Sequence, residues 1–170
     1  IGGRRADVER VASILGVEPR PLEGVPTVHC EVMAPVAQRY RDLHLLPTVA
    51  PEGMQFYSGC WARPFKLTEA SAADSIVANA MHGLDYPATI ERAYADGVRV
   101  FVEAGPQGSC ARMVGAILGD RPHVAVSACR KGRTGLRNLL EAVGACAEAG
   151  VPVDLSVLYG ATGGVPEARF

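Results

Sequence analysis

Apolar residues recur every three or four positions in several stretches of the chain, which is the spacing of an amphipathic helix. Near the start, Val8, Val11 and Leu15 share one such face, and Gly16 follows them as a C-terminal stop signal. The same pattern predicts five further helices, which fall at about residues 31–46, 67–83, 87–97, 108–119 and 134–150.

Shorter apolar runs between these helices predict strands. In the clearest of them, residues 98–106, valines alternate with other residues before a Gly-Pro pair ends the run. Two more runs fall at residues 54–61 and 123–128, and residues 17–26 are extended and interrupted by prolines. Strands that alternate with helices in this way favour an α/β fold with a largely parallel sheet.

The composition narrows the class of partner. Seventeen basic and eighteen acidic residues leave a formal net charge of −1, and no basic stripe is present that would neutralise a nucleic acid backbone. No apolar run is long enough to span a membrane, and the first ten residues lack the layout of a signal peptide.

The five cysteines form no CxxC pair, so neither structural zinc nor a disulfide framework is expected. A reduced, cytoplasmic setting is therefore predicted.

Histidines are the first candidates for acid–base chemistry. We interpret His44, in a predicted helix, and His123, at the start of a predicted strand, as structural. His29 stands in "GVPTVHCEVMAP", where an extended run meets a helix. Residue chemistry alone leaves two interpretations of it open, a catalytic base or a histidine that lies at a junction. Cys30 is not expected to pair with it, because neighbours on a strand point to opposite faces.

A search for a nucleophile finds no complete motif. No serine of the chain stands in the G-x-S-x-G pattern of a nucleophile elbow. Ser109, in "GPQGSCA", comes closest, since it follows a predicted strand and opens a predicted helix. The backbone N–H groups of such a loop can hold an anion. A Gly-Pro turn is, however, also a common way to link a strand to a helix without binding anything. The loop is neither a P-loop nor a dinucleotide-binding fingerprint.

Four segments carry motifs that occur together and in a fixed order. They read "IGGRRADVERVASILG" (1–16), "VPTVHCEVMAPVAQRYRDL" (25–43), "VANAMHGLDYPATIERAYADGVRVFVEAGPQGSC" (77–110) and "GVPVDLSVLYG" (150–160). In this order they resemble the C-terminal half of the malonyl-CoA:acyl-carrier-protein transacylase family. That family includes the acyltransferase domains of polyketide and fatty-acid synthases.

The resemblance implies an α/β-hydrolase-like acyltransferase core joined to part of a small ferredoxin-like subdomain. Residues 1–24 would end the small subdomain, and residues 25–150 would form the C-terminal part of the large subdomain. Residues 151–170 would be an exit segment or a linker that follows the acyltransferase.

The resemblance also implies a serine–histidine dyad. A serine attacks the thioester of malonyl-CoA, His29 takes its proton, and the backbone carbonyl of Gly83, four residues before Pro87, orients the imidazole. The serine, the oxyanion-hole segment and an arginine for the malonyl carboxylate come earlier in the family, so the N-terminal part of the same domain is an expected partner. The other expected partners are an acyl carrier protein with its phosphopantetheine and the neighbouring synthase domains. No bound cofactor or metal is expected.

The residues that end at the histidine, "PTVH", stand where the family carries a specificity tetrad. Thr27 and Val28 are therefore expected to line the substrate pocket, and Val28 would crowd an α-methyl group, which favours malonyl over methylmalonyl. Residues 103–113 are similar to those of iterative synthases that make polyunsaturated or enediyne chains. The sequence thus predicts a malonyl transferase domain of an iterative type I polyketide synthase. The alternatives are a non-catalytic scaffold of a synthase and, last, a nucleotide-binding α/β protein.

Overall fold

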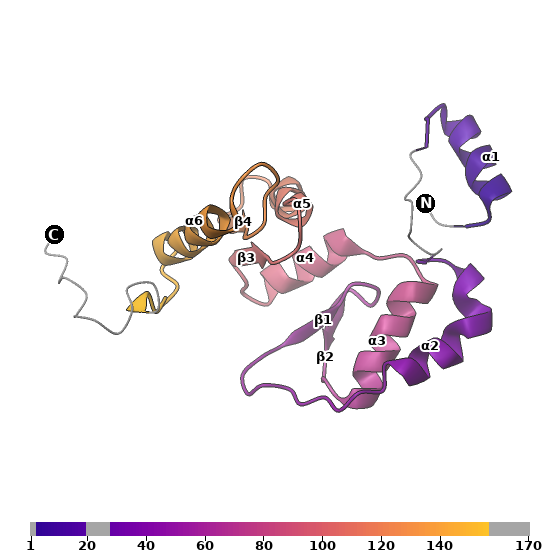
Figure 1. The fold of residues 1–170 in the computed structure, drawn as a ribbon, viewed down its shortest axis with the longest axis horizontal. Helices are drawn as coiled ribbons and strands as arrows, with labels where there is room; N and C mark the ends of the chain where they lie inside the picture. Colours follow the sequence, from indigo (N-terminus) through magenta and orange to yellow (C-terminus); the bar gives the residue numbers. More distant parts are fainter. Residues whose placement is uncertain (1–2, 20–27, 157–170) are drawn as a thin grey trace, which may run out of the picture. The chain divides into compact units, whose positions relative to one another are not determined.

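The described residues form two small sheets, one antiparallel and one parallel (Figure 1). The computed structural model describes residues 3–19 and 28–156, and the chain divides into two units between Asp96 and Gly97. The first unit contains α1 (Arg5–Leu15), the 3-10 helix η1 (Glu31–Val36), α2 (Ala37–Leu43), β1 (Phe56–Ser58), β2 (Arg63–Phe65), α3 (Glu69–Met81) and α4 (Tyr86–Ala95). The second contains β3 (Val100–Glu103), α5 (Ser109–Leu118), β4 (Val124–Ser127) and α6 (Gly135–Glu148).

The first predicted helix is confirmed as α1. It ends at Gly16, which has a φ of 62° and donates its N–H to the carbonyls of Ala12 and Ser13. The second predicted helix is divided, because η1 covers its first six residues and α2 covers Ala37–Leu43, while residues 44–46 are not helical. Pro35 explains the division, since it has no N–H to donate and its ring clashes with the carbonyl of an α-helical turn.

The predicted strand at residues 54–61 is shorter in the structure and belongs to a hairpin. β1 pairs with β2 in antiparallel register, with Phe56 opposite Phe65 and Ser58 opposite Arg63. β2 was not expected, because the sequence Arg63-Pro64-Phe65 contains a proline and shows no alternation. The turn between the strands is tight, with Ala62 at a φ of 49°.

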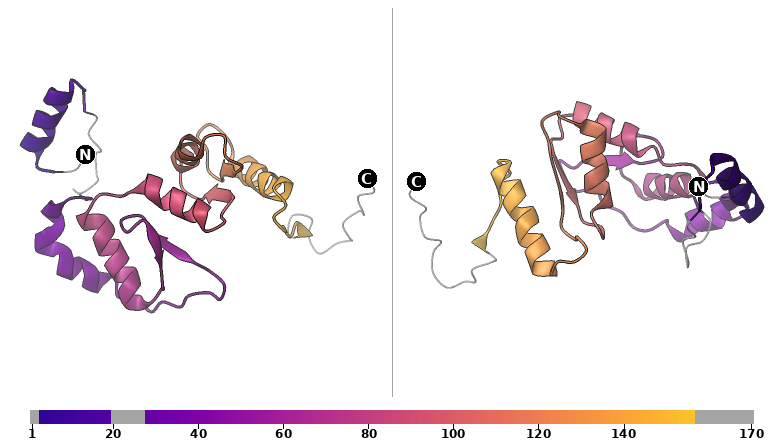
Figure 2. Two further views of the ribbon diagram at one scale, coloured as in Figure 1. Left: turned by 180° about the vertical axis from the view of Figure 1, so that it is seen from behind. Right: turned by 90° about the horizontal axis from the view of Figure 1, so that it is seen from above.

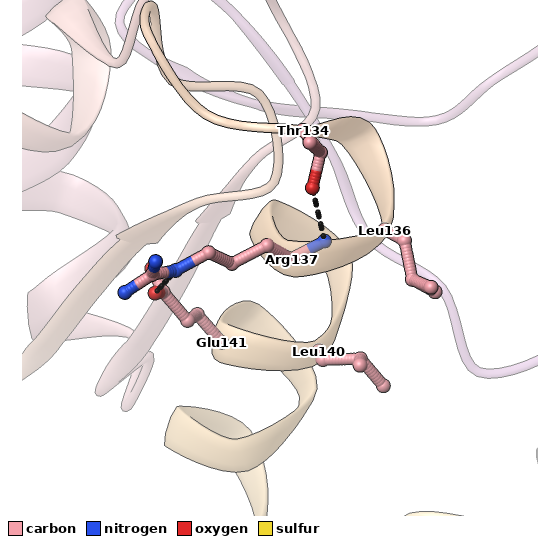
Figure 3. Close-up of a pocket in the computed structure, with 5 residues that line it drawn as sticks. All are labelled: Thr134, Leu136, Arg137, Leu140 and Glu141. Atoms are coloured by element: carbon pink, nitrogen blue, oxygen red, sulfur yellow. Dashed lines mark hydrogen bonds and ion pairs between the residues drawn. The ribbon is translucent and has the colours of Figure 1, made fainter.

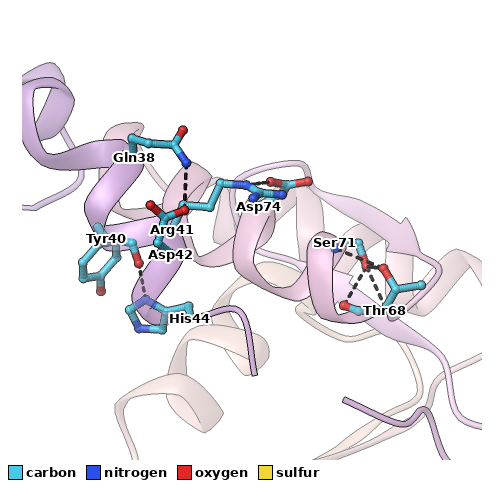
Figure 4. A network of polar contacts seen from close by, with 8 residues as sticks. All are labelled: Gln38, Tyr40, Arg41, Asp42, His44, Thr68, Ser71 and Asp74. Carbon is cyan, nitrogen blue, oxygen red and sulfur yellow. Dashed lines mark hydrogen bonds and ion pairs between the residues drawn. The ribbon is translucent and has the colours of Figure 1, made fainter. Parts of the chain in front are cut away.

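Helix α3 begins with a capping box (Figure 4). The Thr68 hydroxyl accepts the N–H of Ser71 at 3.1 Å, and the Ser71 hydroxyl accepts the N–H of Thr68 at 2.8 Å. Two N–H groups of the helix start that lack intrahelical partners are therefore satisfied. Helices η1 and α2 pack against α3, and Arg41 of α2 donates to Asp74 of α3 at 2.6 Å. This hydrogen bond raises the pKa of Arg41.

Helix α4 contacts both strands of the hairpin. The Tyr57 hydroxyl of β1 donates to the Asp96 carboxylate at 2.8 Å, and Arg92 of α4 donates to the same carboxylate at 2.9 Å. The hydrogen bond from Arg92, followed by that from Tyr57, lowers the pKa of Asp96. These bonds fix the end of α4 to β1.

The second unit is a parallel strand pair with two helices packed on it (Figure 2). Val100 is opposite Val124 and Glu103 is opposite Ser127. Helix α5 contacts both strands, and α6 contacts β4. Four buried hydrophobic residues form the centre of this unit: Val114, Leu118, Val126 and Ala142.

The α/β class is confirmed, while the parallel arrangement holds for β3 and β4 and not for the hairpin. The predicted boundaries at residues 24 and 150 stay predictions, and residues 20–24 and 157–170 lie outside the described part of the chain. In that described part, no helix combines the length and the apolar character needed to cross a membrane.

Candidate functional site

His29 lies at the C-terminal end of α3, although fifty residues of sequence separate it from the helix residue that its ring contacts. The last four carbonyls of an α-helix have no intrahelical partner. In α3, the Ala78 carbonyl accepts the N–H of His82 at 2.9 Å, and the Ala80 carbonyl accepts the N–H of His29 at 2.7 Å. The carbonyl between them, that of Asn79, accepts a short hydrogen bond from Nδ1 of the His29 ring. His29 therefore caps α3 from a distant part of the sequence.

The backbone of His29 adopts a left-handed conformation with a φ of 64°. This region costs an ordinary residue about 1–2 kcal/mol, although histidine is found there more often than most residues. The two hydrogen bonds to the end of α3 offset that cost. The described residues 28–30 form a bend that leads into η1, so the side-chain alternation of a strand does not apply to His29 and Cys30.

The contact with Asn79 determines which nitrogen of the imidazole carries the proton. A carbonyl oxygen can only accept, so Nδ1 of His29 must donate, and in the neutral ring Nε2 is then a hydrogen-bond acceptor. His29 is exposed, and no hydrogen bond reaches its Nε2 from the described residues. This geometry would allow His29 to act as a general base.

The carbonyl at the ring belongs to Asn79, and not to Gly83 as we expected. The expectation took the position four residues before Pro87 as the end of the helix. Helix α3 ends earlier, at Met81, and His82 is already extended with a φ of −126° and a ψ of 166°. Gly83 lies beyond the helix, so its carbonyl is not one of the terminal carbonyls that His29 caps.

The two predicted pocket residues precede His29 directly. Val28 is half-buried and adjoins the histidine in the chain. Thr27 lies outside the described residues. Their role as a substrate pocket stays a prediction.

The other histidines that we interpreted as structural make local contacts. The Nδ1 atom of His44 lies 2.6 Å from the carbonyl of Tyr40 (Figure 4), and that of His123 lies 2.7 Å from the carbonyl of Arg121. Both partners lie within four residues in the chain. A long-range contact with a helix end distinguishes His29 from these two histidines.

The loop before α5, where Ser109 opens the helix, is already occupied by an anionic side chain. The Glu103 carboxylate, at the end of β3, accepts the N–H of Ala111 at 2.9 Å. Gly108, the residue before the helix, makes no side-chain cap, so Glu103 takes the place of a capping residue and complements the helix dipole. The candidate anion site of this loop is thus filled from within the chain.

Replacing Glu103 by alanine is expected to lower the free energy of unfolding by about 1 kcal/mol, because α5 loses its capping acceptor. The matched control is Glu103→Gln, which keeps an acceptor oxygen and removes only the charge, and a smaller loss is expected for it. Urea unfolding of the complete domain measures both. Equal stability of Glu103→Ala and the parent would contradict this role of Glu103.

A shallow pocket lies at the start of α6 (Figure 3). Leu136 and Leu140 form its apolar side, and Arg137 donates to Glu141 at 2.9 Å on the other. The Thr134 hydroxyl accepts the N–H of Arg137 as a helix cap. The Thr134 hydroxyl and the Glu141 carboxylate are thus both engaged in hydrogen bonds within α6. Among the residues that the structure describes, no three His, Cys, Asp or Glu side chains gather as a metal site would require.

Comparison with solved structures assigns the fold. The chain is 25% identical to the acyltransferase domain from the second module of the salinomycin polyketide synthase, with a TM-score of 0.77 over 94% of this chain. The acyltransferase domain of SpnD, in complex with 2-(pent-4-yn-1-yl)malonyl, matches 86% of this chain with a TM-score of 0.69 and 24% identity. The chain has an acyltransferase-domain fold.

This is the fold that the resemblance of the four sequence segments implies. The chain spans 38% of the length of the salinomycin synthase chain and 36% of that of SpnD. No protein-family model and no curated protein sequence matches it.

Proposed function

We propose that this chain is the histidine-bearing part of an acyltransferase domain that moves a malonyl group from malonyl-CoA to an acyl carrier protein. The observation that carries the proposal is the contact of His29 Nδ1 with the Asn79 carbonyl, which leaves Nε2 as an exposed acceptor. A serine from the N-terminal part of the same domain would be the nucleophile. The acyltransferase domains of similar fold support the same role.

In the first half-reaction, Nε2 of His29 takes the proton of the serine hydroxyl as the oxygen attacks the thioester carbon of malonyl-CoA. The carbon–sulfur bond then breaks, and the CoA sulfur leaves with the proton from the imidazolium. The products are free CoA and a malonyl ester on the serine. During this step the Asn79 carbonyl keeps Nδ1 protonated and holds the ring in place.

In the second half-reaction, the phosphopantetheine thiol of the carrier protein gives its proton to Nε2 of His29. The sulfur attacks the malonyl ester, the carbon–oxygen bond to the serine breaks, and the serine oxygen recovers the proton. His29 therefore serves as base and then as acid in each half-reaction. The resemblance of residues 103–113 supports an iterative synthase, whose neighbouring domains would extend the chain with this malonyl unit.

Mass spectrometry of the acyl-enzyme tests the proposal and the choice of substrate. The complete domain is incubated separately with malonyl-CoA and methylmalonyl-CoA, and the intact protein is weighed. A malonyl adduct is expected, with little methylmalonyl adduct, because Val28 beside His29 would crowd an α-methyl group. Val28→Ala is the matched variant, and its methylmalonyl adduct is expected to increase.

The outcomes separate the alternatives. A complete domain that forms no adduct with either thioester would overturn the transferase and favour the non-catalytic scaffold. A methylmalonyl adduct equal to the malonyl adduct would leave the transferase in place and overturn the role of Val28.

A further inference from the structure

Asn79 makes a second contact that the proposed function does not use. Its backbone carbonyl meets the ring of His29, while its side-chain Oδ1 accepts the N–H of Cys60 at 2.8 Å. We propose that the Asn79 side chain is a positioning residue for His29. It ties the last turn of α3 to the β1–β2 turn, and so it fixes the carbonyl that orients the imidazole. This inference rests on the proposed role of His29 as the base.

The end of a helix needs such an anchor. The terminal turn of a helix frays, because its carbonyls are not held by a following turn. A carbonyl that has to orient a catalytic ring must stay in place to a fraction of an ångström, since a misplacement of about 1 Å can cost roughly a hundredfold in rate. The hydrogen bond from Cys60 supplies a tertiary contact on the same residue that carries this carbonyl.

The β1–β2 turn is itself held at two further points, so it offers a firm support. The N–H of Ala62 donates to the carbonyl of Ser58 at 2.8 Å across the turn. The N–H of Asp85, which follows α3, donates to the carbonyl of Gly59 at 2.9 Å. The turn is thus fixed both internally and to the segment after the helix.

Ser75 provides a matched control within the same helix face. It lies four residues before Asn79, and its hydroxyl donates to the hydroxyl of Ser58 at 3.0 Å. Both serines are buried, at 7% and 1% exposure. Ser75 therefore holds the end of β1 against α3 and Asn79 holds the turn that follows it, but only Asn79 carries the carbonyl that meets His29.

The test compares variants of the complete domain in a malonyl transfer assay, with thermal unfolding measured for each. Asn79→Ala removes the acceptor for Cys60, and a fall in kcat of roughly 10- to 100-fold with KM unchanged is expected. Asn79→Leu keeps about the same side-chain volume but has no oxygen to accept the Cys60 N–H. The same fall in kcat is expected for it, and it replaces Asn79→Ala in the test if the alanine variant does not fold. Asn79→Asp keeps an acceptor for the Cys60 N–H, so it is expected to regain most of kcat.

Ser75→Ala is expected to lower the unfolding temperature about as much as Asn79→Ala while leaving kcat within about twofold of the parent. Equal losses of kcat in the two variants would show a structural effect only and overturn the inference. A folded Asn79→Leu with the kcat of the parent would overturn it as well.

His29→Ala, assayed in parallel, distinguishes this inference from the proposed function. If transfer survives in that variant, the proposed function fails and the inference fails with it. If His29→Ala is slow and the Asn79 variants are normal, only the positioning role of Asn79 is overturned.

Discussion

Replacing His29 by alanine in the complete acyltransferase domain is expected to slow malonyl transfer by roughly 10²- to 10⁴-fold, the usual contribution of a positioned general base. The alanine has no group to take the serine proton, and it leaves the Asn79 carbonyl without its donor. The backbone at this position also disfavours alanine, because its φ of 64° is left-handed. Some loss of stability is therefore expected beside the loss of rate.

His29→Asn separates these two effects. Asparagine tolerates the left-handed conformation, and its amide N–H₂ can donate to a carbonyl, but it cannot take a proton from serine. We expect this variant to unfold near the temperature of the parent and to transfer malonyl as slowly as His29→Ala. The rate is measured from loss of malonyl-CoA in the presence of carrier protein. A near-normal rate in the folded asparagine variant would remove His29 from the reaction.

Replacing Leu118 by alanine is expected to lower the free energy of unfolding by about 2–5 kcal/mol, the largest stability effect that we expect of a single change in the chain. Leu118 is only 2% exposed, on the face of α5 that packs against β3 and β4. Val114, one turn earlier, is buried to the same degree. Removing the leucine side chain deletes apolar contacts and leaves a cavity that this small unit cannot fill by relaxation.

Met113→Ala is the matched control on the same helix. Its side chain is 44% exposed, so its truncation is expected to change the free energy of unfolding by less than about 1 kcal/mol. Denaturant titration of the complete domain followed by circular dichroism measures both variants. Equal losses from the two positions would contradict the packing of α5 through Leu118.

The elements that were predictable are those whose signals lie within a few residues of one another. The spacing of apolar residues and the glycine that follows them define α1, and the alternating valines define β3. β2 was not predicted, because its three residues include Pro64 and show no strand pattern of their own. They form a strand because they pair with β1. The break between η1 and α2 depends on Pro35, and the spacing of apolar residues does not show the effect of a proline on the helix.

The site shows the same division between local and distant signals. His29 could be singled out from its segment, and residue chemistry together with the family resemblance pointed to a base. Its partner could not be located by counting back from Pro87, because the end of α3 is set by packing and capping. The bond between His29 and Asn79 joins residues fifty positions apart, and no local pattern encodes it.

The carboxylate at the start of α5 has a consequence for ligand choice. Glu103 is tethered eight residues from the amide that it accepts, so it acts as an intramolecular ligand with a high effective concentration. A phosphate that approached this end of β3 would have to displace a group of the same charge and then remain close to it. Nucleotide-binding α/β proteins use the corresponding position for their phosphates. In this chain that position is closed by the protein itself, so a phosphate group is not expected to bind at the start of α5.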